Sequence, residues 1–525
     1  MTKNTTYISS FFLTLLCATT AISQYHYVQV QDTHFMLEGK PYYFVGTNFW
    51  YGCYIGSAGQ TGDTLRLLRE LDRLKSEGID NLRILGASEA STNQAVVQPA
   101  IQTSPGVYND SLLIGLDFLL SEMGKRDMKA VVFINNYWNW SGGMTQYLSW
   151  FGGGGSMYDA SPFYRNVSAN AAYKQYLNDL IHRQNTVSGL YYYEDPAIMA
   201  WELANEPRPG NSSTYLNAFY QWIDSTAHYI HSIDTNHLVT TGNEGTMGCL
   251  GGSDVFLTAH QSPSIDYATI HVWALNWGWI NPSNMSGTYS SALLQASTYI
   301  RDHIGYARQL NKPLTMEEFG LPRNNEEYSP KSAATFRDQY YNALLQLIYD
   351  SAAAGAPIAG SNFWGWGGEA RSPNNDFTWR AGDPFMCDPP MEAQGLNSVF
   401  DTDSSTISIL KKHSLLMTGL RGSKGVAEQP NIVYDFSLEQ NYPNPFNPAT
   451  AIQFSLLSPS RISLVIYNLL GQKVKTLAQR AEGMGTHTVI WDGTDEYYRP
   501  VASGMYVYRL QTDHASLRKK MLLVR

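Results

Sequence analysis

Two glutamates stand out because each follows a run of apolar residues in the chain. Glu206 lies in "MAWELANEPR" (199–208), between an asparagine and a proline, and Glu318 lies in "TMEEFG" (315–320). Two carboxyl groups that meet in one cleft can divide the work of breaking a glycosidic bond, one as the acid and the other as nucleophile or base. This chemistry requires a fold that brings the two distant segments together.

Eight short apolar runs have the composition of β-strands, and amphipathic helical patterns lie between them. The strand candidates are 42–49, 81–86, 129–136, 197–206, 237–245, 267–273, 313–320 and 360–366. The helical patterns include 64–78, 173–184, 215–232 and 336–355. Strands that alternate with helices predict an α/β fold with a parallel sheet, and eight repeats fit a closed (β/α)8 TIM barrel better than an open sheet.

Polar residues follow seven of these runs at the carboxyl end of the predicted strand. A single such residue is more often a solvated or ion-paired loop residue, but seven strands that share the pattern are harder to dismiss. The carboxyl ends of barrel strands meet on one face, where barrel enzymes carry their sites. The residues are Asn48, Arg83, Asn135 with Asn136, Asn205 with Glu206, His271, Glu318 and Trp364.

The order of these residues resembles glycoside hydrolase family 5, in which an Asn-Glu-Pro motif after strand four holds the acid/base and a glutamate after strand seven is the nucleophile. Here the motifs read Asn205-Glu206-Pro207 and Glu318-Phe319-Gly320, and the resemblance covers roughly residues 25 to 418. It implies that Glu206 protonates the leaving oxygen and that Glu318 attacks the sugar. We expect an aromatic cleft to keep Glu206 protonated while Arg83 keeps Glu318 ionised.

The same resemblance implies roles for the other strand-end residues. Asn205 would hydrogen-bond the hydroxyl next to the anomeric carbon, His271 would orient the two glutamates, and Trp364 would form the floor under the sugar. Glu317 is the rival nucleophile, and strand alternation is expected to turn it to the opposite face from Glu318. Many relatives have a tyrosine that contacts the nucleophile where this chain has Trp273. We assign Trp273 to substrate binding because an indole N–H can donate a hydrogen bond but cannot take a proton.

Within the family the sequence is most similar to β-mannanases, through "GTNFWYG" (46–52), "HVWALNWGW" (271–279) and "DPPMEAQGLNSVFDTDSST" (388–406). Trp50 and Asn136 are also assigned to substrate binding. The function implied is an endo-β-1,4-mannanase that retains anomeric configuration, acts on mannan, glucomannan or galactomannan, and needs no metal or cofactor. An endo-β-1,4-glucanase and a barrel that binds polysaccharide without cutting it remain alternatives.

The composition agrees with an exported protein that handles uncharged polymers. Charged residues make up 15% and aromatic residues 13% of the 525 residues, and the net charge of −9 argues against a nucleic-acid partner. Residues 1–23 read as a signal peptide, and no later apolar run is long enough for a transmembrane segment. Cys53, Cys249 and Cys387 permit one disulfide or none, and their spacing fits no zinc site.

The last part of the chain differs from the predicted catalytic domain (24–420). A polar linker (421–434) precedes alternating segments that predict a small all-β sandwich over 435–525. The motifs "NYPNPFNP", "YNLLGQKV" and "SGMYVYRL" resemble the C-terminal sorting domains of type IX secretion substrates, which implies secretion machinery as a partner and a secreted or surface-attached protein. A carbohydrate-binding module is the alternative, but Tyr467, Trp491 and Tyr506 fall within apolar strand runs, as core residues would.

Overall fold

The protein divides into two compact units, Met1–Gly425 and Val426–Arg525, and each has its own hydrophobic core. The computed structural model describes residues 27–93, 95–156, 158–421, 436–456, 459–468, 472–512 and 516–524. The predicted signal peptide and all but the first residue of the predicted linker lie outside these ranges. Among the described residues, no helix is both long enough and apolar enough to cross a membrane.

Eight parallel strands form the centre of the first unit, and their order in the sheet is β10-β9-β8-β5-β4-β13-β12-β11. A bridge between Thr240 and Tyr267 links β10 to the residue before β11 and closes the ring, which confirms the predicted barrel. The strands are β4 (Phe44–Asn48), β5 (Asn81–Leu85), β8 (Lys129–Phe133), β9 (Ile198–Glu202), β10 (Leu238–Thr240), β11 (Ala268–Val272), β12 (Leu314–Phe319) and β13 (Ile358–Phe363).

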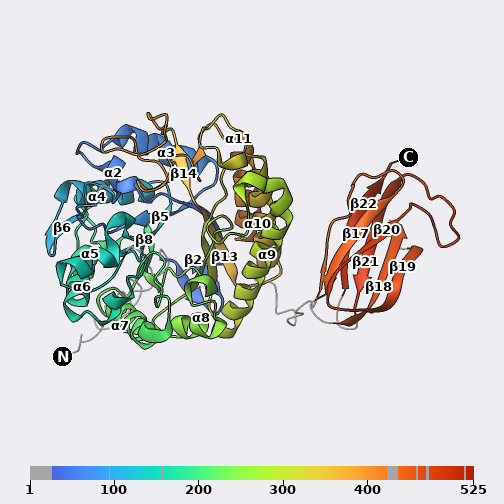
Figure 1. Ribbon diagram of the computed structural model, residues 1–525, viewed down its shortest axis with the longest axis horizontal. Coiled ribbons are helices and arrows are strands. Elements are labelled where there is room, and N and C mark those ends of the chain that lie inside the picture. The colour runs from blue at the N-terminus through green and yellow to red at the C-terminus, as the bar shows by residue number, and fades with distance from the viewer. Residues whose placement is uncertain are drawn as a thin grey trace, which may run out of the picture. The chain divides into compact units, whose positions relative to one another are not determined.

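A helix follows each barrel strand, and together the eight helices surround the strands (Figure 1). These helices are α3 (Thr64–Ser76), α4 (Asp110–Gly124), α6 (Val167–Ile181), α7 (Leu216–Ile233), α8 (Ser253–His260), α9 (Met285–Leu310), α10 (Thr335–Ala353) and α11 (Ser404–Leu420). The loops contain the shorter elements α2 (Gly52–Gly56), α5 (Gly143–Trp150), β6 (Gln102–Ser104), β7 (Val107–Tyr108), β14 (Trp366–Gly368) and β15 (Val399–Phe400).

The sequence of α3 shows how these helices are specified. Asp63 caps its first turn by accepting a hydrogen bond from the backbone N–H of Arg66 at 2.9 Å. Leu67, Leu71 and Leu74 recur at helical spacing and are all fully buried. The apolar stripe therefore packs on the barrel while Arg69, Asp72 and Arg73 face outward.

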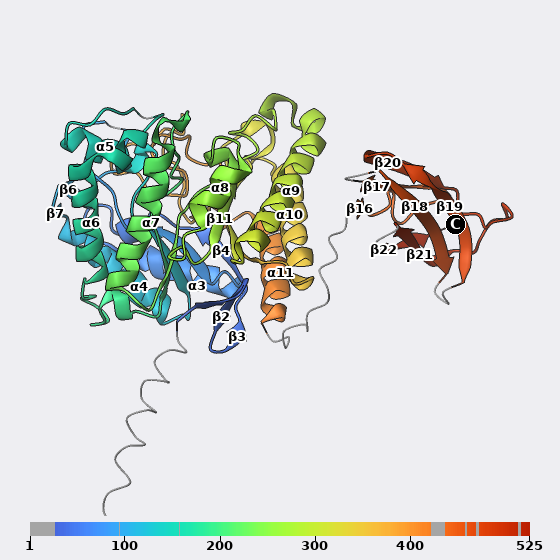
Figure 2. The same cartoon turned by 90° about the horizontal axis from the view of Figure 1, so that it is seen from below.

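Three short strands cover the end of the barrel where the parallel strands begin. They are β1 (Gln29–Gln31), β2 (His34–Leu37) and β3 (Lys40–Pro41), and they form an antiparallel sheet at one end of the barrel (Figure 2). The ring of Phe35 packs against the rings of Phe44 and Tyr267, with centroids 6.3 and 5.1 Å away. This end is therefore filled by side chains, which leaves the opposite end for a site.

All eight predicted strands exist, but most end earlier than the sequence suggested. The prediction placed one strand over 197–206 and another over 237–245, whereas β9 ends at Glu202 and β10 ends at Thr240. The difference arises because polar and small residues after each strand leave the sheet and turn into the loops. Asn205 and Glu206 are therefore loop residues held just above β9.

The second unit consists of two antiparallel sheets that share one core. One sheet has the order β16-β17-β20 and the other β19-β18-β21-β22. The strands are β16 (Phe436–Leu438), β17 (Thr450–Leu456), β18 (Ser460–Asn468), β19 (Lys473–Glu482), β20 (Gly485–Trp491), β21 (Gly504–Gln511) and β22 (Ser516–Leu523). Trp491 and Tyr506 are buried in the core as predicted, but Tyr467 is only half-buried and lies under the guanidinium of Arg509.

The three cysteines of the described barrel do not pair. Cys53, Cys249 and Cys387 are buried free thiols, so the option of no disulfide holds for these three residues. Burial raises the pKa of the Cys53 thiol to about 12, and the pKa of Cys387 is raised as well. A buried neutral thiol acts as a small apolar side chain in the core.

Candidate active site

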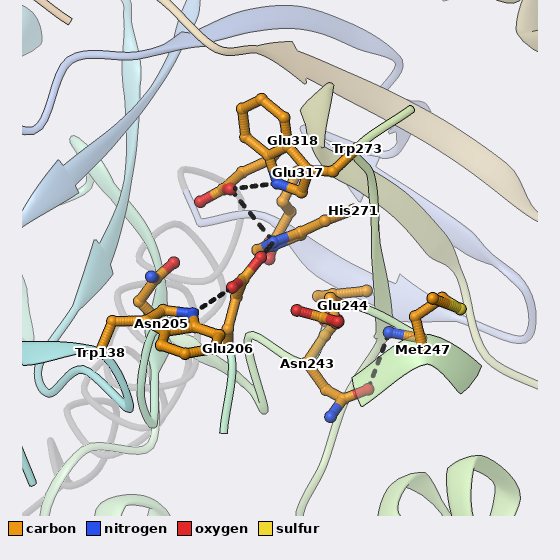
Figure 3. A network of polar contacts seen from close by, with 12 residues as sticks. Trp138, Asn205, Glu206, Asn243, Glu244, Met247, His271, Trp273, Glu317 and Glu318 are labelled. Atoms are coloured by element: carbon orange, nitrogen blue, oxygen red, sulfur yellow. Dashed lines mark hydrogen bonds and ion pairs between the residues drawn. The ribbon is translucent and has the colours of Figure 1, made fainter. Parts of the chain in front are cut away.

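The predicted site residues meet at the carboxyl end of the barrel. Asn48 of β4 is paired in register with Arg83 of β5, and His271 of β11 is paired with Glu318 of β12. Glu206 approaches from the loop after β9, and Figure 3 shows its carboxyl group pointing toward His271. The barrel thus brings together residues that are far apart in the sequence, as the strand-end pattern predicts.

Arg83 lies at the base of the site and is fully buried. Its Nη1 donates to Asn48 Oδ1 at 3.0 Å and to Glu318 Oε1, and its Nη2 donates to Asn205 Oδ1 at 2.7 Å. Nε and Nη2 also form a two-point ion pair with Glu202, at 2.8 and 2.5 Å. The sequence pattern predicted the contact with Glu318 but missed Glu202, a charged residue inside an apolar strand run.

Glu318 is held by three donors. Besides Arg83, the indole Nε1 of Trp273 donates to Glu318 Oε2 at 3.1 Å, and Nδ1 of His271 lies 3.2 Å from the same oxygen. Trp273 therefore contacts the proposed nucleophile directly, a contact that the assignment to substrate binding did not include. Its ring also packs edge-on against Trp364, with centroids 5.9 Å apart.

Glu206 has a backbone conformation that is uncommon for a residue with a side chain. Its φ of +50° is in the left-handed region, and its N–H donates to the carbonyl of Gly242 at 2.9 Å. Neighbouring loops hold the segment as well, because Asn205 N–H donates to the carbonyl of Asn135 and the amide of Asn243 donates to the carbonyl of Pro207. The strained residue aims its carboxyl group into the site.

Glu206 and His271 form a coupled pair. His271 Nδ1 lies 2.7 Å from Glu206 Oε1. Burial would raise the pKa of Glu206, but the hydrogen bond and charge of His271, the charge of Arg208 and the hydrogen bond from Trp138 lower this pKa to about 2. Burial would lower the pKa of His271, yet the charge of Glu318 and hydrogen bonds to both glutamates raise it to about 10.

The expectation that the cleft keeps Glu206 protonated is therefore wrong for the free site. Burial alone favours the neutral acid, but His271 is a cation beside Glu206 and stabilises its ionised form. The proton that the pair shares lies on the imidazole. This coupling was not visible in the sequence because it depends on the 2.7 Å contact between the loop after β9 and strand β11.

Glu317 does not simply face away from the site. The register of β11 and β12 shifts after Ile270, so that β12 accommodates one extra residue at this point. Glu317 Oε1 accepts a hydrogen bond from Tyr267 at 3.2 Å, and its Oε2 lies 3.9 Å from Arg83 Nε. Burial and the nearby charge of Glu202 raise the pKa of Glu317 well above the usual value, which favours its neutral form.

Trp50 and Asn136, both assigned to substrate binding, are buried and contact other residues of the protein instead. Trp50 is 0% exposed, its indole N–H donates to the carbonyl of Cys387 at 2.5 Å, and its ring packs on Trp140. Asn136 is fully buried, and its Oδ1 accepts from the amide of Asn205 at 3.1 Å and from the backbone of Trp138 at 3.0 Å. The structure therefore corrects both assignments, because neither side chain is open to a ligand.

Three further residues surround Glu206 and were missing from the sequence prediction. The indole Nε1 of Trp138 donates to Glu206 Oε2. The guanidinium of Arg208 lies 4.7 Å from the ring centroid of Trp138 and donates to both carboxyl oxygens of Glu244, at 2.6 and 2.7 Å. Arg208 completes the motif "NEPR" and Glu244 follows β10, so both were visible as charged residues after strands.

The described residues contain one group of side chains spaced closely enough to surround a metal ion. It consists of Glu206, His271 and Glu318, each of which offers one ligand atom within 4.8 Å of the others. These atoms already bind one another and the donors of Arg83, Trp138 and Trp273. Arg83 and the protonated His271 already place positive charge at this group, so it is a poor match for a metal ion. The arrangement favours acid–base chemistry instead.

A (β/α)8 barrel with two carboxyl groups of different environment at its mouth defines a glycoside hydrolase of the barrel type. A family profile described as GH family 5 beta-mannosidase-like matches residues 25–421. The chain therefore belongs to the β-mannosidase-like proteins of glycoside hydrolase family 5. A second profile, the secretion system C-terminal sorting domain, matches residues 440–524.

Known relatives agree with this membership. Mannan endo-1,4-beta-mannosidase 1 from Arabidopsis thaliana is 30% identical over 354 residues, which are 64% of this chain and 81% of that protein. The structure of a family 5 mannosidase from Rhizomucor miehei matches with a TM-score of 0.70 and 30% identity, and covers 76% of this chain and 99% of that one. The endo-1,4-beta-mannanase from the same fungus matches with a TM-score of 0.57 and 25% identity, over 75% and 99% of the two chains.

The sorting domain places the enzyme outside the cytoplasm. Its profile covers nearly the whole second unit, and the barrel carries a complete set of strand-end residues of its own. The protein is therefore a glycoside hydrolase that is secreted or attached to the cell surface. The carbohydrate-binding module considered as an alternative for the tail is not needed to explain its sequence.

Proposed function

We propose that the enzyme is an endo-β-1,4-mannanase that cuts internal bonds of mannan, glucomannan or galactomannan with retention of configuration. The observation that carries the mechanism is the distance between the two carboxyl groups, because oxygens of Glu206 and Glu318 lie within 4.8 Å of each other. Retaining enzymes hold these groups about 5 to 5.5 Å apart, whereas inverting enzymes leave about 6.5 to 9.5 Å for a water molecule. The mannan-acting relatives support the substrate class.

The reaction proceeds in two displacements. In the first, a carboxylate oxygen of Glu318 forms a bond to the anomeric carbon while the glycosidic bond breaks and Glu206 gives its proton to the leaving oxygen. In the second, Glu206 takes a proton from water, the water oxygen bonds to the anomeric carbon, and the bond to Glu318 breaks. Glu206 then returns this proton to His271, which restores the free site, so the cycle is balanced.

The neighbouring residues separate the roles of the two glutamates. Arg83 and Trp273 donate to Glu318, which keeps the nucleophile ionised and fixes its direction. His271 touches both glutamates and carries the proton of the coupled pair in the free site. This proton must lie on Glu206 when the leaving oxygen arrives, so His271 is the immediate source of the acid.

Asn205 and Trp364 complete the proposed sugar site. The Asn205 side chain is fixed by Arg83 and Asn136, which suits a residue that must hold the sugar 2-hydroxyl through the transition state. Trp364 is buried against Trp273 and Trp140 and offers a rigid aromatic floor. Because mannose and glucose differ at the 2-hydroxyl, Asn205 and His271 are the candidates for discriminating between them.

The test uses purified protein and locust bean gum, a galactomannan. An endo-acting retaining enzyme lowers the viscosity of locust bean gum early, relative to the reducing ends released, and NMR shows the β-anomer as the first product. Glu318→Gln should abolish turnover, whereas Glu317→Gln should retain it. An α-anomer as the first product, or a dead Glu317→Gln variant beside an active Glu318→Gln variant, would overturn the assignment.

A second candidate is the removal of single mannose units from chain ends. It is favoured by the higher TM-score of the Rhizomucor miehei mannosidase, 0.70 against 0.57 for the endo-mannanase of that fungus. Mannose as the only early product, with viscosity unchanged, would establish this mode of attack. Equal activity on carboxymethylcellulose would instead favour the endo-β-1,4-glucanase alternative.

A further inference from the structure

Both carboxyl oxygens of Glu206 accept hydrogen bonds in the free site. Oε1 contacts Nδ1 of His271 at 2.7 Å, and Oε2 accepts from the indole Nε1 of Trp138 (Figure 3). The indole differs from the imidazole in one respect, because it can donate a hydrogen bond but holds no transferable proton at ordinary pH. Trp138 therefore stabilises the ionised form of Glu206 more than the neutral acid.

The Trp138 side chain is clamped in this position. Its backbone N–H donates to Asn136 Oδ1 at 3.0 Å, and the guanidinium of Arg208 covers the indole face at 4.7 Å from the centroid. Both oxygens of Glu244 hold Arg208 Nη2 in place. The backbone of Glu244 is fixed in turn, because its carbonyl accepts from the hydroxyl of Tyr299 at 2.7 Å.

We propose that Trp138, clamped by Arg208 and Glu244, is a positioning residue that biases Glu206 toward its ionised form and so favours the second displacement over the first. This inference rests on the proposed acid/base role of Glu206. Glu206 must be an acid in the first displacement and a base in the second. A fixed N–H donor makes Glu206 a weaker proton acceptor from His271 before the first displacement and keeps it ionised, as a base must be, in the second. Trp138 thereby sets the pH range over which both displacements run.

Several charged groups also face Glu206 and contribute to its titration. His271 from β11 and Arg208 from its own loop lower the pKa of Glu206. Glu244, after β10, is coupled to Glu206, and burial with the charge of Glu206 raises its pKa to about 8. Glu318 of β12 and Glu392 of the loop before β15 are the remaining acidic groups near the pair. A test must separate the indole from these groups.

The experiment compares Trp138→Phe with the wild-type enzyme on a mannooligosaccharide and on a 2,4-dinitrophenyl β-mannooligoside. Removal of the donor raises the pKa of Glu206, so the limb that Glu206 sets should move upward by about one pH unit on each substrate. On the mannooligosaccharide this is the basic limb, because Glu206 must be protonated in the first displacement. With the dinitrophenyl substrate the first displacement needs no acid, so kcat reports the second displacement and its acidic limb should move upward.

Trp222→Phe is the matched control, because Trp222 is buried in α7 and its indole Nε1 has no hydrogen-bond partner among the described residues. Its pH profile should coincide with that of the wild type. Trp138→Leu also lacks the donor and gives the same shift if Trp138→Phe does not fold. A lower rate with an unmoved profile in both Trp138 variants would assign Trp138 a purely structural role and overturn the inference.

Two further variants distinguish the sources of failure. If the basic limb moves in Glu244→Gln but not in Trp138→Phe, Glu244 sets that limb and the inference is wrong. If azide fails to restore activity to Glu206→Ala on the dinitrophenyl substrate, the proposed role of Glu206 fails before that of Trp138 is tested. Azide rescue together with an unshifted Trp138→Phe profile refutes the role of Trp138 alone.

Discussion

Replacement of Arg83 by methionine should destabilise the barrel severely, and a second substitution should repair much of the loss. Methionine preserves much of the length of Arg83 but removes the guanidinium that pairs with Glu202 at two points and with Glu318. Glu202 is 0% exposed, so the variant leaves a buried carboxylate without its counter-charge. Breaking a buried ion pair in this way costs about 3–5 kcal/mol of unfolding free energy.

The expected change in melting temperature follows from the size of the barrel. The matched region spans residues 25–421, and unfolding entropies of about 2.1 cal/mol/K per residue give roughly 0.8 kcal/mol/K for a domain of this length. A loss of about 3–5 kcal/mol therefore corresponds to a decrease of about 4–6 °C. Arg83→Met with Glu202→Gln removes the lone charge, and we expect it to recover at least half of this decrease.

Tryptophan fluorescence is a suitable assay because every tryptophan except Trp491 precedes residue 421, so the signal reports mainly the barrel. The wild type, both single variants and the double variant form a double-mutant cycle. A decrease below 1 °C for Arg83→Met, or a double variant no more stable than Arg83→Met, would refute the view that Glu202 depends on Arg83 for its charge balance. Activity should be lost in Arg83→Met in either case.

Three further outcomes are expected. Azide added to Glu206→Ala should restore turnover of a dinitrophenyl substrate and yield a β-glycosyl azide, and an α-azide would contradict retention. Removal of residues from about 435 onward should leave hydrolysis of soluble mannan unchanged in the purified barrel while secretion fails in the native host; lost hydrolysis would show that the tail supports the barrel. The His271–Glu206 pair should stabilise the fold most between about pH 4.5 and 6.5. The stabilisation from protonated His271 is lost as the pH rises toward 10, and the stabilisation from ionised Glu206 is lost as the pH falls toward 2. If thermal unfolding shows that His271→Gln destabilises the protein equally at pH 6 and pH 10, this prediction is wrong.

The strand-end rule predicted the barrel and the central residues of the site because both depend on local sequence patterns. Apolar runs ended by polar residues specify parallel strands, and parallel strands place Arg83, His271 and Glu318 on one face whatever path the loops take. The assignment of Trp50 to substrate binding, which did not come from the strand-end rule, failed although Trp50 also follows a strand. The loop that carries Cys387 packs over its indole, and this long-range contact has no signature near residue 50.

The bulge in β12 illustrates a second limit. Alternation along an ideal strand predicts that Glu317 and Glu318 face opposite ways, and one extra residue in the register with β11 is enough to bring Glu317 within 3.9 Å of Arg83. Glu202 could have been predicted to need a cationic partner, because it is a charged residue within a buried strand. Arg83, the middle residue of β5, was already identified.

Trp138, which the sequence analysis missed, and Trp273, which it assigned to substrate binding, each act on a carboxyl group through a neutral N–H donor. Trp273 donates to the nucleophile and Trp138 to the acid/base, so each glutamate is paired with one indole from a different loop. An indole stabilises negative charge without supplying a proton, and it therefore leaves His271 as the only transferable proton source that contacts both glutamates among the described residues. This division explains how one imidazole between two carboxyl groups can serve a reaction in which one proton leaves with the departing sugar and another returns from water.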